Sequence, residues 1–574
     1  MSSATASVEP RTPAAPAALT HRQILSVLSG LLMGMFLAAL DQTIVTTAIR
    51  TIGDDLHGLS AQAWVTTAFM ITSTISTPLY GKLSDILGRK PLFLAAISIF
   101  MVGSALCTFS TSMYTLAAFR ALQGIGAGGL MSMAFAIMAD VISPRERAKY
   151  QGYFMAVFGT SSVLGPVVGG ALAGAGSIFG LAGWRWIFLI NVPLGLVALA
   201  VVNRVLRLPH MPVKQRIDWW GAALLAVGLV PLLIVAEQGR LWGWAGGRAL
   251  ACYAIGGIAL AGFFATERRM GDAALLPLRL FGNRTFAIGA VHSLTIGAAM
   301  LGGTAVVPLY MQIARGATPT ESGLLMLPMV IGTMSASMVS GRWTSRTGRY
   351  RMFPIIGSIM LIFAFLWLSR VGATTPLWYT DIGLLMTGAG MGLNMQTIIL
   401  AVQNAVPPRD MGVATSSTTF FRSLGGTLGT AVFLSVLFST VGPNIVAAFR
   451  KAGTIPAVSP AGVLNDSAVL NRLPRAQALP FQQGFSTSMS LVFLVVACLM
   501  VLLLLISLLL QELPLRSVAG MQAAHAEAHS DATGGAGNGD AAGGAGAGDA
   551  AGSAPSDDAE DDAELDEPAS ASRG

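Results

Sequence analysis

Two ionisable residues, Asp41 and Arg120, lie inside long apolar stretches of the sequence. A charged Asp within a membrane-spanning helix costs at least about 2.5 to 3.5 kcal/mol on insertion scales, so it faces a partner or a cavity. Asp41 is about 17 residues into the first apolar segment, roughly 25 Å from the start of a helix that rises ~1.5 Å per residue. Arg120, a few residues into the fourth segment, is predicted to lie at a comparable depth in the bilayer.

Burial in a low dielectric favours the neutral form of an acid, whereas a neighbouring cation favours the charged form. An acid held between these influences can take up and release a proton as its access to water alternates. A permanent structural ion pair between Asp41 and Arg120 is the alternative interpretation.

A second group of charges lies in GKLSDILGRK, from Gly81 to Lys90, between two apolar segments. Gly81 and Gly88 suit a tight turn, because glycine allows conformations and close contacts that other residues resist. Asp85 and Arg89 place opposite charges at fixed positions in this turn. The segment can brace helices against each other, or its bases can set only the topology.

A degenerate copy of this segment, GRWTSRTGRY, starts at Gly341, 260 residues after Gly81. Ser345 stands in the copy where the first segment has Asp85, which leaves an equivalent brace in doubt. The glycine-rich run at Gly124 is likewise echoed at Gly388, 264 residues on. The chain is therefore internally duplicated, which is typical of membrane transporters.

The elements that position these residues are predicted to be membrane-spanning helices. The chain has 574 residues, of which 53% are hydrophobic and only 11% are charged, whereas soluble proteins carry about 25% charged residues. About fourteen apolar runs are long enough to span a bilayer, and only helices or closed barrels satisfy the backbone there. The fold class is an all-α membrane protein.

The net charge of +7 conceals a split, because 13 of the 28 acids follow Leu510. The bases lie in short loops between apolar segments, which argues against nucleic-acid binding. With the N-terminus inside, inner loops and termini hold about 23 Lys and Arg and outer loops about 10, so the positive-inside rule places both termini in the cytoplasm. The segment after Leu510 is acidic and rich in Ala and Gly, a composition that favours disorder.

The spacing of the repeats predicts two six-helix bundles separated by two inserted helices. The longest polar outer loop is expected between Gly442 and Gln483. The predicted parts are a disordered N-terminus, a first bundle, two inserted helices with linkers, a second bundle and a disordered acidic tail, at residues 1–22, 23–206, 207–284, 285–510 and 511–574.

Six motifs carry a resemblance to a known family. In chain order they are LDQTIVTTAIRTI from Leu40, GKLSDILGRK from Gly81, RALQGIGAGG from Arg120, GPVVGG from Gly165, WRWIFLINVPLG from Trp184 and FRSLGGTLG from Phe421. Over about residues 23–510 the chain resembles the fourteen-helix drug:proton antiporters of the major facilitator superfamily, the EmrB/QacA type. Thr46 and Arg50 depart from the usual residues of the first motif.

The resemblance implies roles for several residues. It makes Asp41 the expected protonation site, beside Arg120, and it assigns a conformational latch to Gly81, Asp85, Gly88 and Arg89. The GPVVGG segment, with Gly165, Pro166, Gly169 and Gly170, marks antiporters in the family, although a packing and kink motif explains it equally well. Arg422, deep in its apolar segment, is a candidate cavity residue with Asp381 as a candidate partner.

The resemblance implies a proton-coupled efflux transporter, not an enzyme, that exports small hydrophobic or cationic compounds by alternating access. Alternatives are an exporter of a lipid, an antibiotic or another endogenous metabolite, a proton-coupled importer, and a non-transporting membrane sensor or enzyme. No G-x-x-x-x-G-K-[ST] phosphate loop occurs, so an ion gradient is the expected energy source.

The expected partners are a small-molecule substrate, protons and the lipid bilayer, without nucleic acid, nucleotide or cofactor. Cys107, Cys252 and Cys498 all lie in apolar segments and suggest neither a disulfide nor a metal site. The protein is expected to be a monomer in the bacterial plasma membrane.

Overall fold

The computed structural model describes residues 20–57, 62–206, 217–455 and 473–515. Almost all of the predicted N-terminal segment and of the acidic tail lies outside these ranges. The chain divides into two units, residues 1–524 and 525–574, and all the described residues belong to the first.

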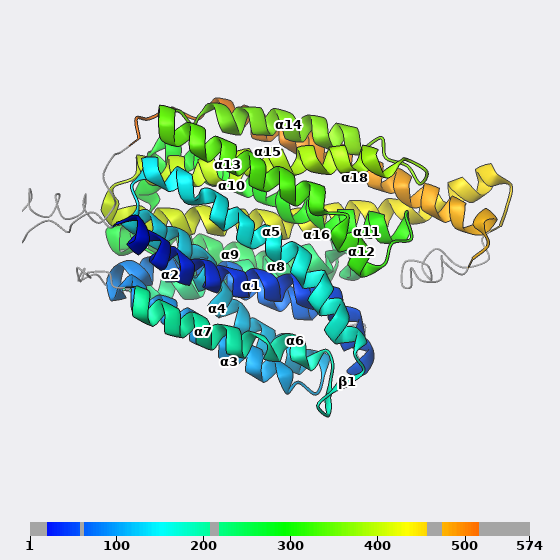
Figure 1. Cartoon of the computed structure of the whole chain (residues 1–574), viewed down its shortest axis with the longest axis horizontal. Helices are drawn as coiled ribbons and strands as arrows, with labels where there is room; N and C mark the ends of the chain where they lie inside the picture. Colours follow the sequence, from blue (N-terminus) through cyan, green and yellow to red (C-terminus); the bar gives the residue numbers. More distant parts are fainter. Residues whose placement is uncertain (1–19, 58–61, 207–216, 456–472, 516–574) are drawn as a thin grey trace, which may run out of the picture. The chain divides into compact units, whose positions relative to one another are not determined.

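The described chain is a set of long helices packed along a common direction (Figure 1). The first bundle contains α1 (His21–Asp55), α2 (Gln62–Leu87), α3 (Arg89–Thr108), α4 (Met113–Val141), α5 (Pro144–Gly174), α6 (Arg185–Leu189) and α7 (Asn191–Val205). The inserted pair is α8 (Trp219–Trp242) and α9 (Gly247–Met270). The second bundle contains α10 (Arg284–Gly297), α11 (Thr304–Ile313), α12 (Pro319–Leu324), α13 (Leu327–Thr347), α14 (Met352–Leu368), α15 (Leu377–Ala405), α16 (Met411–Ala452) and α18 (Arg475–Leu508).

Short elements connect these helices. A two-residue hairpin, β1 (Ser177–Ile178) and β2 (Leu181–Ala182), precedes α6. The 3-10 turns are η2 (Gly271–Ala273), η3 (Leu278–Gly282) and η5 (Pro408–Asp410), and the π-helical segment η4 (Ala298–Gly303) joins α10 to α11.

Twelve helical segments of the described chain are long and apolar enough to cross a membrane. Two further helices pack with them: α2 against α4 in the first bundle, and α14 against α15 in the second. The prediction of an all-α membrane protein is confirmed.

Local sequence explains where several of these helices begin. Thr20 and Ser112 form capping boxes at the starts of α1 and α4, in which side chain and backbone satisfy each other's hydrogen bonds. Ser143 caps α5, and Pro144 follows at the first helical position, where its missing N–H costs nothing.

The outer loop predicted between Gly442 and Gln483 is shorter in the structure, because α16 continues to Ala452 and α18 begins at Arg475. Apolar residues sustain these helix extensions, as the rings of Phe449 and Phe481 pack with centroids 4.8 Å apart. The prediction was wrong here because the polar residues of this stretch concealed a helical apolar face.

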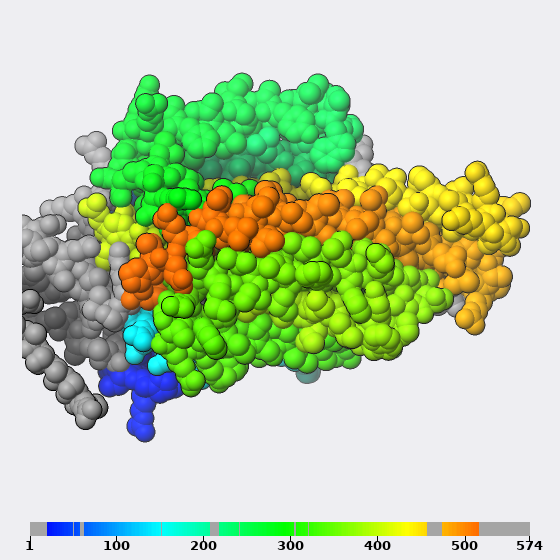
Figure 2. Space-filling view, turned by 90° about the horizontal axis from the view of Figure 1, so that it is seen from above, coloured from blue at the N-terminus to red at the C-terminus, as the bar shows by residue number. Residues whose placement is uncertain are grey.

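The inserted helices α8 and α9 pack against each other, and α8 also contacts α2 and α16. Figure 2 shows this pair, in green at the top, as a layer beside the yellow α16. The pair therefore touches both bundles, and its linker to α10 (residues 271–283) runs along the end of the molecule where α2 meets α3.

That end also carries the second copy of the glycine-rich segment, between α13 and α14. We call it the motif end, defined by residues 81–90 and 341–350; it lies to the left in Figure 1. The other end, where α3 meets α4, is called the opposite end.

Candidate functional site

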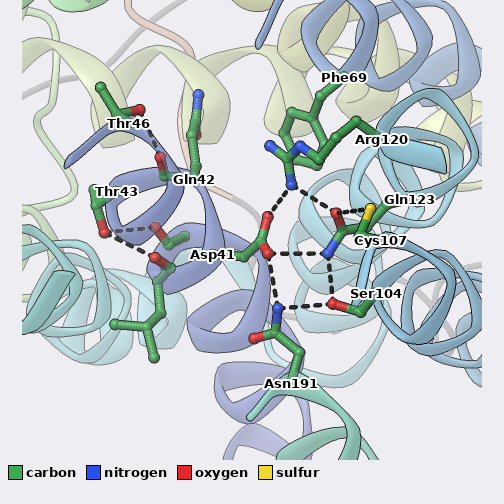
Figure 3. A network of polar contacts seen from close by, with 12 residues as sticks. Asp41, Gln42, Thr43, Thr46, Phe69, Ser104, Cys107, Arg120, Gln123 and Asn191 are labelled. Atoms are coloured by element: carbon green, nitrogen blue, oxygen red, sulfur yellow. Dashed lines mark hydrogen bonds and ion pairs between the residues drawn. The ribbon is translucent and has the colours of Figure 1, made fainter. Parts of the chain in front are cut away.

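A network of buried polar side chains surrounds Asp41 in the first bundle (Figure 3). Asp41 on α1 is fully buried and forms an ion pair with Arg120 of α4, which is 1% exposed. The amides of Gln123 and Asn191 donate hydrogen bonds to the other carboxylate oxygen, Oδ1, at 2.9 and 2.7 Å. Both amides also donate to Ser104 Oγ, so α1, α3, α4 and α7 meet at this network.

Arg120 has contacts besides Asp41. Its Nη1 donates to Gln123 Oε1 at 2.6 Å, and its guanidinium lies 4.0 Å from the centroid of the Phe69 ring on α2. A guanidinium over an aromatic face is attracted by the ring quadrupole. Arg120 therefore has a second acceptor and a stacking surface if its bond to Asp41 is lost.

The chemistry available at this network is proton binding. Oδ1 of Asp41 already accepts two amide hydrogen bonds, whereas Oδ2 faces Arg120. A proton arriving at Asp41 would displace Arg120 from Oδ2 and leave both amide bonds in place. The structure thus brings together the two residues, Asp41 and Arg120, that the sequence paired.

A second cluster of charges lies at the motif end, around Asp85. Asp85 and Arg89 form an ion pair of 2.6 Å, and Arg89 Nε also donates to Asp140 of α4 at 2.7 Å. The carboxylate of Asp85 lies against Gly412 at the start of α16, where a Cβ would be 2.3 Å from Oδ1. Helix N-termini favour anions, so Asp85 joins α2 of the first bundle to α16 of the second.

The two glycines of this segment, Gly81 and Gly88, have different structural roles. A Cβ on Gly81 would lie 1.9 Å from Ser416 Oγ, so glycine lets α2 and α16 approach closely. Gly88 has φ of +95° and ψ of 150°, a conformation that essentially only glycine adopts, at the turn into α3.

In the second copy, the place of Asp85 is taken by Ser345, but a contact between bundles is present. Arg145 of α5 donates from Nε to the Ser345 carbonyl at 3.0 Å and from Nη2 to the Arg346 carbonyl at 3.3 Å. These carbonyls belong to the last turn of α13, and cations are favoured at helix C-termini. Here a cation of the first bundle meets a helix C-terminus of the second, the reverse of the arrangement at Asp85.

Arg147, also on α5, makes a third contact between the bundles at this end. Its guanidinium is buried, donates to Gln403 Oε1 of α15, and also bonds the carbonyls of Ala139 and Ile142 at 3.0 and 2.9 Å. No pattern in the sequence singled out Arg147.

The linker between the inserted helices and α10 is tied into the same end. Lys82 donates from Nζ to the Asp272 carbonyl at 2.8 Å, and Arg279 binds both carboxylate oxygens of Asp410 at 2.7 Å. These hydrogen bonds hold the pKa of Arg279 above its ordinary value. The linker thus bonds to α2 on one side and to the start of α16 on the other.

The GPVVGG segment packs α5 onto α1 beside the Asp41 network. A Cβ on Gly165 would lie 2.1 Å from Thr43 Oγ1, and one on Gly169 would lie 2.8 Å from the Ile44 carbonyl. Pro166 faces Gly323 of α12 in the second bundle, where a Cβ would be 2.8 Å away. Gly170 follows on the same helix.

The candidate pairing of Arg422 with Asp381 is wrong. Arg422 on α16 lies over the ring of Phe135 on α4, at 5.8 Å from the centroid, whereas the charge that acts on Asp381 is that of Arg315. The reason is depth, since Asp381 is in the second turn of α15 at the opposite end and Arg422 is the twelfth residue of α16 from the motif end.

The second bundle contains a buried polar network without a charge. His292 Nε2 lies 3.0 Å from Asn394 Oδ1, and Ser358 joins Asn394 at 3.4 Å and Ser507 at 3.2 Å. These residues lie on α10, α15, α14 and α18. The described residues contain no group of three or more His, Cys, Asp or Glu that could hold a metal ion.

Comparison with known proteins decides the family. A family model described as Major Facilitator Superfamily matches residues 31–430, most of the chain. The chain belongs to the Major Facilitator Superfamily.

Two curated relatives and one solved structure are similar to this superfamily member. It is 38% identical over 494 residues to an uncharacterized MFS-type transporter of Mycobacterium tuberculosis, covering 86% of this chain and 70% of that protein. It is 35% identical over 411 residues to Multidrug resistance protein 3 of Bacillus subtilis, covering 71% of this chain and 79% of that protein. The human organic anion transporter MFSD10 matches with a TM-score of 0.54 at 17% identity, over 83% of this chain and 99% of that one, which shows a shared fold.

The predicted major facilitator fold is therefore confirmed, and this superfamily member is a multi-pass membrane transporter of small molecules rather than an enzyme. Asp41, Arg120 and Asp85 were identified from the sequence, whereas Asn191 and Gln123 were not. One signal was available for Gln123: it follows Arg120 by three residues and so shares its helix face.

Proposed function

We propose that this protein is a proton-coupled efflux transporter of the fourteen-helix drug:proton antiporter branch. Its relatives include proteins named Multidrug resistance protein 3 and Multidrug transporter protein MdtP in Bacillus subtilis, and Efflux pump FUS6 in Gibberella moniliformis. The substrates are small hydrophobic compounds, and the family resemblance adds cationic ones.

The observation that carries the proposal is the buried ion pair of Asp41 and Arg120. It places one titratable acid within the membrane, with one oxygen held by two amides and the other facing a cation that has an alternative acceptor. Protonation of Oδ2 neutralises Asp41, and Arg120 then remains on Gln123 Oε1 and the Phe69 ring. This change of charge is the step that couples a proton to movement of the bundles.

The contacts at the motif end supply the second part of the cycle. Asp85 against α16, Arg145 against α13 and Arg147 with Gln403 hold the two bundles together there. We place the motif end and both termini in the cytoplasm, by the distribution of Lys and Arg. In this conformation the cytoplasmic side is closed, and transport requires these contacts to break and re-form.

The membrane is proposed to be the bacterial plasma membrane, with the transporter acting as a monomer. Apolar clusters fill the interior of the chain: one, which joins both bundles, includes Phe93 and Leu130, and another, within the second bundle, includes Phe365 and Val492. The proton network lies within a single chain, so one copy contains every residue that the proposal uses.

The test is an efflux screen of hydrophobic compounds in a host lacking its own exporters, followed by uptake into inverted vesicles under an imposed pH gradient. Accumulation should require the gradient, collapse with an uncoupler and be accompanied by release of the gradient. Uptake that survives the uncoupler, or that proceeds without proton movement, would refute proton coupling.

A further inference from the structure

Arg422 is a cation at the interface between the bundles whose partner is a ring rather than an acid. It is the twelfth residue of α16, about 16 Å along the helix from the motif end at ~1.5 Å per residue. Its guanidinium lies 5.8 Å from the centroid of Phe135 on α4. Among the described residues it has no ion pair or hydrogen bond, and the side chain is only partly buried.

Among the described residues, the other arginines at comparable or greater burial are paired. Arg120 has Asp41, Arg89 has Asp85 and Asp140, and Arg147 bonds an amide and two carbonyls. A charged residue within a span is expensive and pairs with another group or lines a cavity. Arg422 is the exception, and it lies between the parts that separate during transport.

Arg422 is therefore an uncompensated positive charge within the part of the chain that the structure describes. Asp41 is already neutralised by Arg120, and Asp381 faces Arg315 near the opposite end. Neither acid compensates Arg422. A cationic compound entering beside Phe135 meets an uncompensated positive charge, whereas an anionic one gains an attraction in a low dielectric.

The surroundings of Phe135 are apolar and adaptable. Its ring stacks on Phe154 of α5 with centroids 5.2 Å apart. The same cluster joins both bundles, and the methionines in and around it include Met131, Met300, Met334 and Met395, which come from four different elements. Methionine side chains adjust to ligands of different shape, so this region suits an apolar body attached to the acidic group.

We propose that Arg422 and Phe135 form part of the substrate site and bind the carboxylate or sulfonate of an anionic amphiphile. The guanidinium presents a planar set of donors that matches such groups with two hydrogen bonds. The proposal rests on the proposed transport function and replaces the expectation that charged substrates are cations.

The experiment measures binding of two probes that differ in one charge. The probes are 11-(dansylamino)undecanoic acid and its methyl ester, added to the full chain in phosphatidylcholine nanodiscs at pH 7.5. Energy transfer from the ten tryptophans to the dansyl group reports probe bound to the protein, after subtraction of protein-free nanodiscs. No proton gradient is present, so the result does not depend on whether transport is proton-coupled.

The wild-type protein should bind the acid about tenfold or more tightly than the ester, as expected for hydrogen bonds to a charged group. Arg422→Gln should remove this preference and leave ester binding in place, which shows that the variant is folded. Arg422→Lys should keep part of the preference. Arg370→Gln, which alters an exposed arginine on the loop before α15, is the matched control and should behave as wild type.

Equal affinity of the wild-type protein for acid and ester would overturn the proposal, and so would absence of binding of both. A preference for the acid that persists in Arg422→Gln would also overturn it. If Arg422→Gln loses ester binding, size-exclusion profiles show whether the variant is folded, and Arg422→Lys becomes the test. A folded Arg422→Lys variant that binds acid and ester equally would overturn the proposal, because the acidic group would then bind elsewhere.

Discussion

The two bundles place polar networks on equivalent helices, but only one network carries charge. In the first bundle, Asp41 and Arg120 are held by amides from α4 and α7. In the second, His292 and Asn394 bond across α10 and α15 without an acid nearby. Both halves thus use buried hydrogen bonds to join helices, while the buried pair of an acid and an arginine is found in only one of the two networks.

The glycine-rich segments differ in the same way. Asp85 in the first copy meets a helix N-terminus, whereas in the second copy Arg145 meets the C-terminus of α13. Both arrangements match a helix dipole, but with opposite charges. Each copy therefore keeps a contact between the bundles, although the residue that makes it lies on a different bundle and has the opposite charge.

The sharpest test of the comparison is Asp41→Asn against His292→Gln. Asn keeps size and hydrogen bonding while removing titration, so accumulation driven by a pH gradient in inverted vesicles should fall to background. His292→Gln keeps a polar partner for Asn394 and should retain most of the activity. Equal loss in both variants, at matched protein levels, would show that the second bundle also titrates.

Replacing the turn glycine should destabilise the protein more in the first glycine-rich segment, at Gly88, than in the second, at Gly348. Gly88 needs a conformation reserved for glycine, so Gly88→Ala should lower the free energy of unfolding by about 1 to 3 kcal/mol. Gly348 has φ of +74° and ψ of −5°, with open space around it, so Gly348→Ala should cost about 1 kcal/mol. Denaturant unfolding of purified protein gives both values, and a larger loss for Gly348→Ala contradicts the distinction.

Asp85→Asn should weaken the first latch while leaving the Arg89 to Asp140 pair intact. The equilibrium between molecules with a closed and with an open motif end should shift toward the open form by about 0.3 to 1 kcal/mol, or up to about 2 kcal/mol because the site is partly buried. Spin labels on the exposed Lys149 and Arg342, one on each bundle, report that ratio as a distance distribution. An unchanged distribution leaves the segment with a topological role alone.

The smallest expected effect belongs to Ser345→Asp, which restores the missing acid beside Arg145. The added ion pair should favour the closed motif end by about 0.2 to 1 kcal/mol, a gain reduced by the unfavourable dipole at the α13 C-terminus. The same two spin labels measure it, with Ser345→Asn as the control. In an Arg145→Ala background the gain should disappear; a gain that remains there has another source.

Much of the fold could be predicted from the sequence, because long apolar segments leave the backbone few alternatives in lipid. Asp41 and Arg120 were identifiable because charges are rare in such segments. Among their partners, Gln123 could be linked to Arg120 only by its place on the same helix face. Asn191 and Ser104 were not identifiable, since amides and hydroxyls are common helix contacts and only packing shows which of them converge.

The bonds between bundles were also invisible in sequence. In the sequence, Arg145 and Arg147 look like ordinary basic residues at the end of a loop. Their hydrogen-bond acceptors lie 200 and 256 residues away along the chain. No periodicity connects residues at such a separation. Arg422 was likewise paired with the wrong residue, because the sequence alone did not show at which residue α15 and α16 begin and therefore at what depth Asp381 and Arg422 lie.

The linker that ties the inserted helices to both bundles has a mechanical consequence. Lys82 bonds to Asp272 on one side of the linker and Arg279 bonds to Asp410 on the other. When the two bundles separate at the motif end, either one of these bonds must break or α8 and α9 must move sideways with a bundle. Sideways movement of a helix pair displaces lipid. The work of each transport cycle then includes a contribution from the surrounding bilayer, and its thickness and lateral pressure become determinants of turnover.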